Sequence, residues 1–323
     1  MSTPVLQIAG LRVEFPGLLR TVKAVRGINL TVTGGTVMGL VGESGSGKSM
    51  TAMAALGLIP KPGVVHGSVK VDGFEVVGRR DAELAPLRGG EAAMIFQNPM
   101  KALNPFFTVG EQMTDAIRCH LPFDKKAAIK AAIAALESVH LPDPTFTLDK
   151  YPHQMSGGQI QRVMIAMALA CQPKVLIADE PTTALDVTVQ AQIISLLREL
   201  VATQDRTILF ITHDLGVVAS LCDNVAVMYA GEIVETGSVV DVFADPKHPY
   251  TQKLMNTVPR LGAGDQNLNF IPGQVPDMGF PPKGCDFHPR CDQADDKCAA
   301  SAPDYMIFNN DHKAACHRLD EAP

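Results

Sequence analysis

The stretch GESGSGKS, residues 42–49, decides the fold class of this 323-residue chain. It follows the apolar run VMGLV (37–41), which predicts a buried strand, and it precedes a helical stretch from about Lys48 to Ile59. The pattern G-x-x-x-x-G-K-S is that of a phosphate-binding loop between a strand and a helix. The glycines let backbone N–H groups wrap around phosphates, and the N-terminus of the helix adds partial positive charge.

The pattern also predicts what the loop side chains do. The Lys48 ammonium is expected to reach the β- and γ-phosphates of a nucleotide, and the Ser49 hydroxyl is expected to ligate Mg²⁺. A dinucleotide-binding loop is a poor alternative, because a G-x-G-x-x-G pattern starting at Gly45 requires glycine where Met50 stands. A glycine-rich turn without a ligand is the other alternative, and the strand–loop–helix context disfavours it. The residues expected to bind ATP here are Gly42, Ser44, Gly45, Ser46, Gly47, Lys48, Ser49 and Met50.

Strands and helices alternate along most of the chain. Apolar and β-branched runs predict strands within residues 1–41 and at 67–76, 92–97, 174–180, 206–213 and 224–237. Helical patterns occupy about 98–151 and 188–204. The alternation predicts an α/β fold with a mainly parallel, doubly wound sheet. Because Pro, Gly and Asp dominate from Pro259 onward, we divide the chain into residues 1–258 and a small, loop-rich C-terminal domain, 259–323.

The run VLIADE (175–180) predicts a buried strand that ends in two carboxylates. Ligands of α/β proteins bind at the carboxyl ends of the strands, so both acids lie where a nucleotide is expected. Asp179 is expected to hold Mg²⁺, directly or through water. Glu180 is expected to polarise a water for in-line attack on the γ-phosphate.

Three further polar residues lie at or just beyond the ends of predicted strands. Gln97 follows the run MIF, His213 follows ILFIT, and Asp186 lies in TTALD. Taken singly, each has an ordinary surface or capping role as its alternative. Taken together at one sheet edge, they indicate one active site, in which Gln97 reaches the metal or the attacking water and His213 contacts the γ-phosphate.

Composition argues against two classes of protein. The chain has 34 acidic and 28 basic residues, a net charge of −6 and no tryptophan, so a basic surface and aromatic stacking platforms for nucleic acid are not expected. The longest apolar run, VMIAMALAC (163–171), is far shorter than the roughly 20 residues of a membrane span. The N-terminus has no charged segment followed by an apolar core, so we expect no signal peptide and a location in the cytosol.

Six motifs, taken in order, resemble those of the ATP-binding cassette (ABC) ATPases. They are GESGSGKS, Gln97, MSGGQ (155–159), VLIADE, TALD (183–186) and His213. The resemblance covers about residues 5–260. It implies a P-loop NTPase cassette with a RecA-like core, an N-terminal antiparallel β subdomain and a helical subdomain at about 98–170.

The same resemblance implies ATP hydrolysis and assigns residues to it. The implied catalytic residues are Glu180, His213 and Gln97, and the implied ligands of Mg²⁺ are Ser49, Gln97 and Asp179. In this family an aromatic residue upstream of the phosphate loop stacks on adenine. Phe15 is the candidate by its order in the chain, with a core position in an edge strand as the alternative.

The stretch QMSGGQIQR (154–162) predicts a second anion site, at the start of an apolar helix and without a lysine. A serine can cap such a helix, and glycines let the backbone approach a phosphate closely. In ABC ATPases two cassettes pack head to tail, so the resemblance implies that this stretch grips the γ-phosphate held by the partner's phosphate loop. The residues implied in this contact are Ser156, Gly157, Gly158, Gln159 and Asp186. Met155 departs from the family pattern, in which leucine is commoner.

A narrower resemblance covers nearly the whole chain. MIFQNPMKALNP (94–105), HPYTQ (248–252) and the cysteine-bearing tail resemble ATP-binding subunits of the dipeptide/oligopeptide permease group. This implies the ATPase subunit of an ABC importer of di- or oligopeptides or related small solutes, peripheral at the cytoplasmic face of the inner membrane. The implied partners are a second ATPase subunit, as a homologous heterodimer rather than a homodimer, two transmembrane permease subunits and, indirectly, a solute-binding protein. The alternative is a soluble ABC ATPase of DNA repair or translation.

Four cysteines crowd into the tail in the spacing Cys-x5-Cys-x6-Cys-x17-Cys. Disulfides are disfavoured in the cytosol. Four thiolates suit zinc, although zinc sites usually have closer cysteine pairs, and they also suit an iron–sulfur cluster. Spacing leaves the two metals open, and the permease resemblance implies a [4Fe–4S] cluster with a structural role, with zinc as the alternative. The implied ligands are Cys285, Cys291, Cys298 and Cys316.

Overall fold

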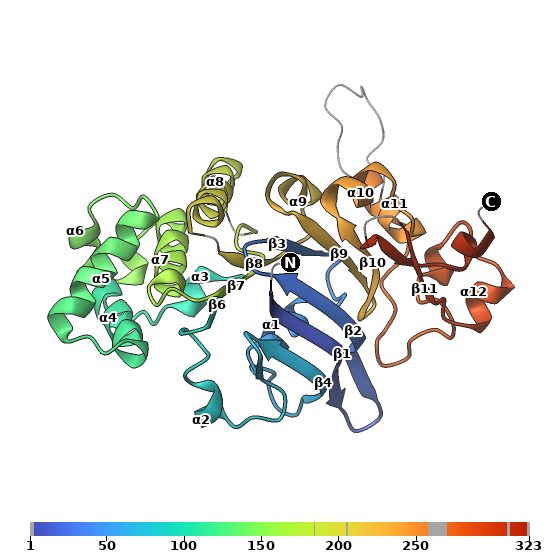
Figure 1. Cartoon of the computed structure of the whole chain (residues 1–323), viewed down its shortest axis with the longest axis horizontal. Coiled ribbons are helices and arrows are strands. Elements are labelled where there is room, and N and C mark those ends of the chain that lie inside the picture. The colour runs from blue at the N-terminus through green and yellow to red at the C-terminus, as the bar shows by residue number, and fades with distance from the viewer. Residues whose placement is uncertain (1–2, 184, 205, 258–269, 309–310, 322–323) are drawn as a thin grey trace. The chain divides into compact units, whose positions relative to one another are not determined.

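The structure is a computed structural model, and it divides into two compact units. The described residues are 3–183, 185–204, 206–257, 270–308 and 311–321. Unit 1 comprises residues 1–6, 32–36 and 70–211, and unit 2 comprises residues 7–31, 37–69 and 212–323 (Figure 1). The domain boundary predicted at 258/259 lies outside the described residues, so it stays a prediction.

Unit 1 contains three neighbouring parallel strands, β6 (Ala92–Ile95), β7 (Val175–Asp179) and β8 (Thr207–Thr212), with β7 between the other two. Every residue of β7 and β8 is buried, as expected for parallel strands covered on both faces. The strands predicted at 92–97, 174–180 and 206–213 are confirmed. The carboxyl end of β7 carries Asp179, the first acid of the predicted pair.

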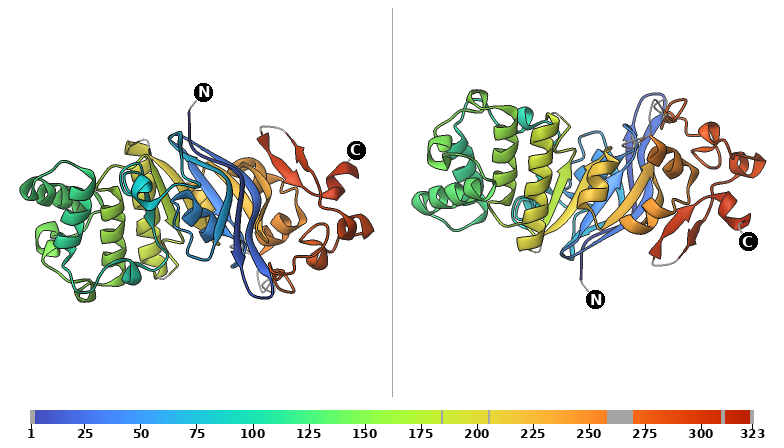
Figure 2. Two further views of the ribbon diagram at one scale, coloured as in Figure 1. Left: turned by 90° about the horizontal axis from the view of Figure 1, so that it is seen from below. Right: turned by 90° about the horizontal axis from the view of Figure 1, so that it is seen from above.

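The helices of unit 1 confirm the helical character predicted for 98–151. Thr108 begins α4 with a reciprocal cap, because its hydroxyl accepts from the Glu111 N–H and its own N–H donates to the Glu111 carboxylate. Helices α4, α5 and α7 pack side by side, as the views in Figures 1 and 2 agree. The elements are α2 (Asp81–Leu84), α3 (Pro99–Ala102), α4 (Val109–His120), α5 (Lys125–Ser138), α6 (Pro144–Leu148), η1 (Pro152–Gln154), α7 (Gly157–Leu169) and α8 (Val187–Gln204).

The remaining strands belong to two sheets. One is the four-stranded sheet β2-β1-β4-β5, and the part of the eight-stranded sheet that lies in unit 2 has the order β11-β12-β10-β9-β3. Strands β3 and β9 are parallel, whereas β9, β10, β12 and β11 pair antiparallel in turn. The bounds are β1 (Pro4–Pro16), β2 (Thr21–Thr33), β3 (Val37–Val41), β4 (Val64–Val71), β5 (Phe74–Glu75), β9 (Asn224–Tyr229), β10 (Glu232–Ser238), β11 (Tyr305–Ile307) and β12 (Lys313–Ala315).

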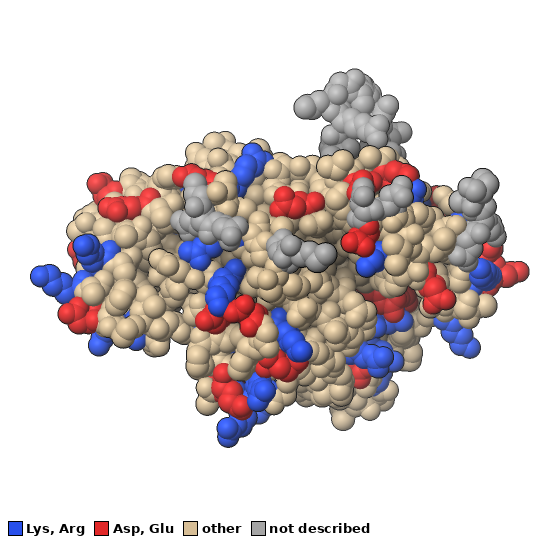
Figure 3. Space-filling view, viewed as in Figure 1, with Lys and Arg blue, Asp and Glu red and all other residues tan. Residues whose placement is uncertain are grey.

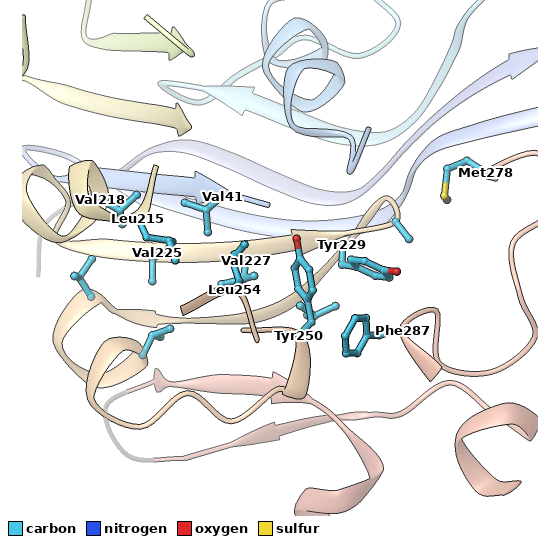
Figure 4. Packing of buried hydrophobic residues seen from close by; sticks show 14 residues of the cluster. Val41, Leu215, Val218, Val225, Val227, Tyr229, Tyr250, Leu254, Met278 and Phe287 are labelled. Carbon is cyan, nitrogen blue, oxygen red and sulfur yellow. The ribbon is translucent and has the colours of Figure 1, made fainter. Parts of the chain in front are cut away.

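The tail completes the core of unit 2. Strand β12 pairs with β10, and Phe287 and Met278 pack in one cluster with Tyr229 and Tyr250 (Figure 4). A loop-rich segment is therefore stabilised by apolar contacts and strand pairing with the cassette. The helices of unit 2 are α1 (Lys48–Ala55), α9 (Leu215–Leu221), α10 (Val239–Ala244), α11 (Pro249–Asn256), η2 (His288–Arg290), α12 (Asp296–Ala300) and η4 (His317–Glu321).

His248 links the stability of unit 2 to pH. Its side chain is 1% exposed, and its Nδ1 accepts the Tyr250 N–H at 3.0 Å, which caps α11. Burial lowers the pKa of His248 to about 3. The unfolded chain, in which the pKa is about 6.5, therefore binds more protons between these values, and stability falls as pH falls through this range.

We expect acidification to destabilise wild type more than His248→Asn, in which the asparagine oxygen can keep the cap. Between about pH 7.5 and about pH 5, the free energy of unfolding should fall by about 2 kcal/mol more in wild type. Urea unfolding followed by circular dichroism at both pH values measures the difference. Equal pH dependence in the two proteins would contradict a buried, neutral His248.

Candidate functional site

The phosphate loop of unit 2 is closed around the amino group of Lys48. The side chain is 4% exposed, and its Nζ donates to the carbonyl oxygens of Gly42 and Glu43, both at 2.8 Å, and to Ser46 Oγ at 3.4 Å. The ammonium thus lies within the loop, where the pattern predicts the phosphates. At the end of the loop, a Cβ added to Gly47 would lie 2.5 Å from the Ala24 carbonyl oxygen, so the close approach there requires glycine.

Helix α1 starts directly after Gly47, at Lys48, so Ser49 and Met50 occupy its first turn as predicted. The turn between β9 and β10 anchors the loop, because the Gly231 N–H donates to the Ser46 carbonyl oxygen at 2.9 Å. Loop and helix start together provide the backbone donors and the cation that suit a polyphosphate.

Phe15 lies near the end of β1, and its side chain is half-buried. A Cβ added to Gly63 would come within 2.8 Å of its ring, so the ring packs against the segment that leads into β4. Stacking of Phe15 on adenine stays a prediction.

In unit 1, three side chains meet at the carboxyl end of β7. Gln97 Nε2 donates to Glu180 Oε2 at 2.9 Å, across 83 residues of sequence. Thr183 Oγ1 donates to the same oxygen, also at 2.9 Å. Glu180 has a φ of +46°, and its N–H donates to the Ile211 carbonyl oxygen at 2.9 Å, so both its backbone and its carboxylate have fixed partners.

The contact between Gln97 and Glu180 agrees with the prediction that both belong to one site. Thr183 was not predicted as a site residue, although it is the first residue of the TALD motif and lies three residues after Glu180. Asp179 is 5% exposed at the end of its strand. Its carboxylate is a hard oxygen ligand of the kind that Mg²⁺ prefers.

The second predicted anion site lies at the start of α7. Ser156 Oγ accepts the Gln159 N–H at 3.3 Å, and Gln159 Oε1 accepts the Ser156 N–H at 3.0 Å. A Cβ added to Gly158 would lie 2.8 Å from a methyl group of Val189, at the start of α8. Asp186 accepts the Val189 N–H at 2.9 Å, so the predicted contact residues gather around two helix starts within unit 1.

The last catalytic candidate, His213, follows β8 and is exposed in unit 2. Asp214 then caps α9, because its Oδ1 accepts the N–H groups of Gly216 and Val217 at 2.9 and 3.2 Å. This cap fixes the start of the helix directly after His213.

The four tail cysteines do not form the predicted cluster site. They line one small cavity that has room for about one water molecule. Within the described part of the chain, no three His, Cys, Asp or Glu side chains are arranged to hold a metal ion. The prediction of a [4Fe–4S] cluster is therefore wrong, and zinc, its alternative, has no site in these ranges either.

Among the described residues, no helix combines the length and the apolar character needed to cross a membrane.

Comparison with known proteins places these features in a family. Residues 25–183 match the family described as "ABC transporter", and residues 234–298 match "Oligopeptide/dipeptide transporter, C-terminal region". The oligopeptide transport ATP-binding protein OppD of Haemophilus influenzae is 47% identical over 313 residues, 97% of each chain. The dipeptide transport ATP-binding protein DppD of Escherichia coli is 46% identical over 319 residues, 98% of each chain.

Solved structures agree with the fold. The dimeric ATP-binding cassette MJ0796 in a post-hydrolysis state, bound to ADP and Pi, superposes with a TM-score of 0.65 at 26% identity. The match covers 72% of this chain and 98% of that one. These similarities confirm the α/β P-loop cassette and imply ATP and Mg²⁺ as ligands. The chain belongs to the ATP-binding subunits of the ABC transporter family, among the relatives of the oligopeptide and dipeptide transport proteins.

Proposed function

We propose that this chain is the ATP-hydrolysing subunit of an importer of oligopeptides or dipeptides. The proposal rests on Glu180, whose carboxylate is held by Gln97 and Thr183 in a chain that matches peptide-transport ATPases over nearly its whole length. An intact and oriented acid favours an active ATPase over a binding module that cannot hydrolyse ATP.

The proposed chemistry divides among these side chains. Lys48 and the loop N–H groups bind the β- and γ-phosphates. Glu180 accepts a proton from the attacking water, Gln97 orients that water, and His213 contacts the γ-phosphate. Mg²⁺, when bound by Asp179, Ser49 and Gln97, neutralises charge on the phosphates.

The start of α7 supports a composite site between two subunits. Ser156 and Gly157 are exposed at the N-terminus of a 13-residue helix, where an anion is stabilised by free N–H groups and the helix dipole. We propose that Ser156, the glycines, Gln159 and Asp186 contact ATP held by the phosphate loop of a second ATPase subunit. A homologous second subunit is favoured over a second copy.

A Ser156→Arg substitution should affect the nucleotide held by the partner subunit but not the nucleotide held by the chain's own phosphate loop. The long cation at the helix start is expected to block closure on the partner's nucleotide and to lower hydrolysis there by about 10²-fold or more, because transition-state contacts are lost. ATP binding by the phosphate loop of the substituted chain should be unchanged. Measurements are ATP binding to the isolated chain and ATP turnover of the assembled pair.

Asp124→Arg is the matched control, because Asp124 caps α5 as Ser156 caps α7, but at a helix start without the glycine pair. It should leave turnover unchanged. If Ser156→Arg instead abolished ATP binding by its own chain and spared the partner's site, the composite site would be refuted.

The helical region of unit 1 also carries exposed apolar side chains. Phe106 is 84% exposed, Phe146 is 63% exposed and Met100 is 53% exposed. Exposed aromatic and methionine side chains are typical of protein contacts. We propose that this region, about residues 98–155, passes the closing and opening of the cassettes to two membrane permease subunits, which hold the chain at the cytoplasmic face of the membrane. A solute-binding protein would deliver the peptide.

A soluble ABC ATPase of DNA repair or translation is the second candidate. On the face in Figure 3, acidic and basic side chains of the described residues are interspersed, which fits a net charge of −6 and disfavours a nucleic-acid surface. Affinity purification from membranes decides between them. We expect two membrane subunits to be recovered with the chain, whereas recovery with ribosomes or DNA alone would favour the second candidate.

A further inference from the structure

Arg290 connects the tail to the phosphate loop within unit 2. Its side chain is 4% exposed, and its guanidinium donates to both carboxylate oxygens of Glu43, at 2.7 and 3.0 Å. It also donates to the Tyr229 hydroxyl at 3.3 Å and to the carbonyl oxygens of Ile271 and Pro272 at 3.1 and 2.9 Å. A bidentate pair between a guanidinium and a carboxylate fixes the relative orientation of the two side chains as well as joining their charges.

Glu43 is itself a residue of the phosphate loop, between Gly42 and Ser44. Its carbonyl oxygen accepts from Lys48 Nζ at 2.8 Å, and its N–H donates to the Tyr250 hydroxyl at 2.9 Å. The side chain of Glu43 therefore pairs with the tail, while its backbone holds the lysine that is expected to bind the phosphates. A shift of Glu43 would move the Lys48 amino group with it.

Aromatic packing also supports the contact between Arg290 and Glu43. The ring of Phe287, from the tail, lies 5.2 Å from the ring of Tyr229 and 5.4 Å from that of Tyr250, measured between centroids. Phe287 is 1% exposed, and Figure 4 shows the three rings lying next to one another. The two tyrosines that contact Arg290 and Glu43 are thus fixed by a tail residue.

Further anchors hold the tail around Arg290. Asp286, 7% exposed, forms an ion pair with Arg26, and Lys253 Nζ donates to the Arg290 carbonyl oxygen at 2.8 Å. Arg290 therefore extends from a segment that is tied to unit 2 on both sides of Phe287, which suits a fixed support for the loop.

We propose that Arg290 is a positioning residue for ATP, which holds Glu43 and thereby keeps the phosphate loop in its binding conformation. The inference rests on the proposed function, because it takes ATP as the ligand of this loop. Without Arg290, the Glu43 carboxylate has lost the guanidinium that fixes its position, and the phosphate loop therefore populates other conformations. Apparent affinity falls in proportion to the fraction of chains that remain competent to bind.

Arg290→Met keeps the length of the side chain and removes the charge. We expect it to raise the Kd and the KM for ATP about tenfold, within the usual range of coupling between sites. The kcat should stay unchanged, since Glu180, Gln97 and Thr183 keep their own contacts. Arg290→Lys, which keeps the charge but not the bidentate geometry, should give an intermediate Kd.

Arg20→Met is the matched control. Arg20 also pairs with a tail acid, Asp277, at 2.6 Å, but the two side chains are 40% and 53% exposed. Among the described residues, no contact joins either side chain to the phosphate loop. Its Kd for ATP should equal that of wild type. The inference is overturned if folded Arg290→Met binds ATP as tightly as wild type, or if Arg20→Met weakens binding equally.

Linkage provides a second test that needs no folded Arg290 variant. If packing of the tail stabilises the conformation of the loop that binds ATP, then bound ATP must stabilise the packed tail by the same free energy. Hydrogen exchange of residues 271–291 should therefore slow when ATP binds wild type, and this slowing should shrink in Glu43→Gln. Exchange that ATP leaves unchanged in this segment overturns the inference, whereas failure of wild type to bind ATP at all refutes the proposed function instead.

Discussion

Replacing Glu180 with Gln is expected to lower the rate of ATP turnover by about 10²- to 10⁴-fold, the usual contribution of a general base. The amide retains the size of the carboxylate and can still accept from Gln97 and Thr183, so the local hydrogen bonds are preserved. It cannot take a proton from the attacking water. ATP affinity should stay close to that of wild type, because the phosphate loop is untouched, and the closed pair of subunits should accumulate.

The measurement compares ATP turnover and ATP binding for the same preparation of the assembled ATPase pair. Glu199→Gln is the matched control, since Glu199 is an exposed acid of α8 whose carboxylate lies 3.1 Å from His140 Nε2. Its turnover should equal that of wild type. A Glu180→Gln protein that keeps most of the wild-type rate would exclude Glu180 as the base.

The second large effect is expected for Lys48→Ala, which should weaken ATP binding about 10- to 100-fold. The estimate follows from about 1.5–3 kcal/mol for hydrogen bonds to a charged group. The substitution also removes the hydrogen bonds that the ammonium makes to Gly42, Glu43 and Ser46 within the loop. Turnover then falls because less ATP is bound, in contrast to Glu180→Gln, in which bound ATP persists.

Calorimetric titration with ATP measures this difference directly. Lys283→Ala, at an exposed lysine of unit 2, is the control for lost positive charge and should bind ATP as wild type does. Wild-type affinity in Lys48→Ala would contradict the assignment of this loop as the phosphate site.

The site residues that could be predicted are those with local signals. A glycine-rich loop between a strand and a helix identifies Lys48, and polar residues after apolar runs identify Gln97 and Glu180. Parallel strands bring such residues to one edge, which is why Gln97 and Glu180 were expected in one site. The hydrogen bond between their side chains, across 83 residues, is a finding of the structure. Thr183 escaped prediction because a threonine near a turn has many ordinary roles.

Contacts that depend on the tail could not be predicted from sequence. Arg290 and Glu43 are 247 residues apart, and neither lies in a pattern that indicates the other. The cysteine spacing was compatible with several chemistries, and the choice of an iron–sulfur cluster relied on resemblance alone. The structure gives the tail apolar contacts through Phe287 and strand pairing through β12, and both stabilise it against the cassette.

The most direct test of the central claim, that ATP hydrolysis by this chain powers peptide import, is uptake of a labelled peptide by the reconstituted transporter. The complex is placed in liposomes with ATP on the side of the ATPase subunits, and the solute-binding protein and labelled peptide are added on the other side. We predict that the peptide accumulates only with ATP and that Glu180→Gln abolishes this accumulation while the complex still assembles. Accumulation that continues with Glu180→Gln, or that needs no ATP, would contradict the claim.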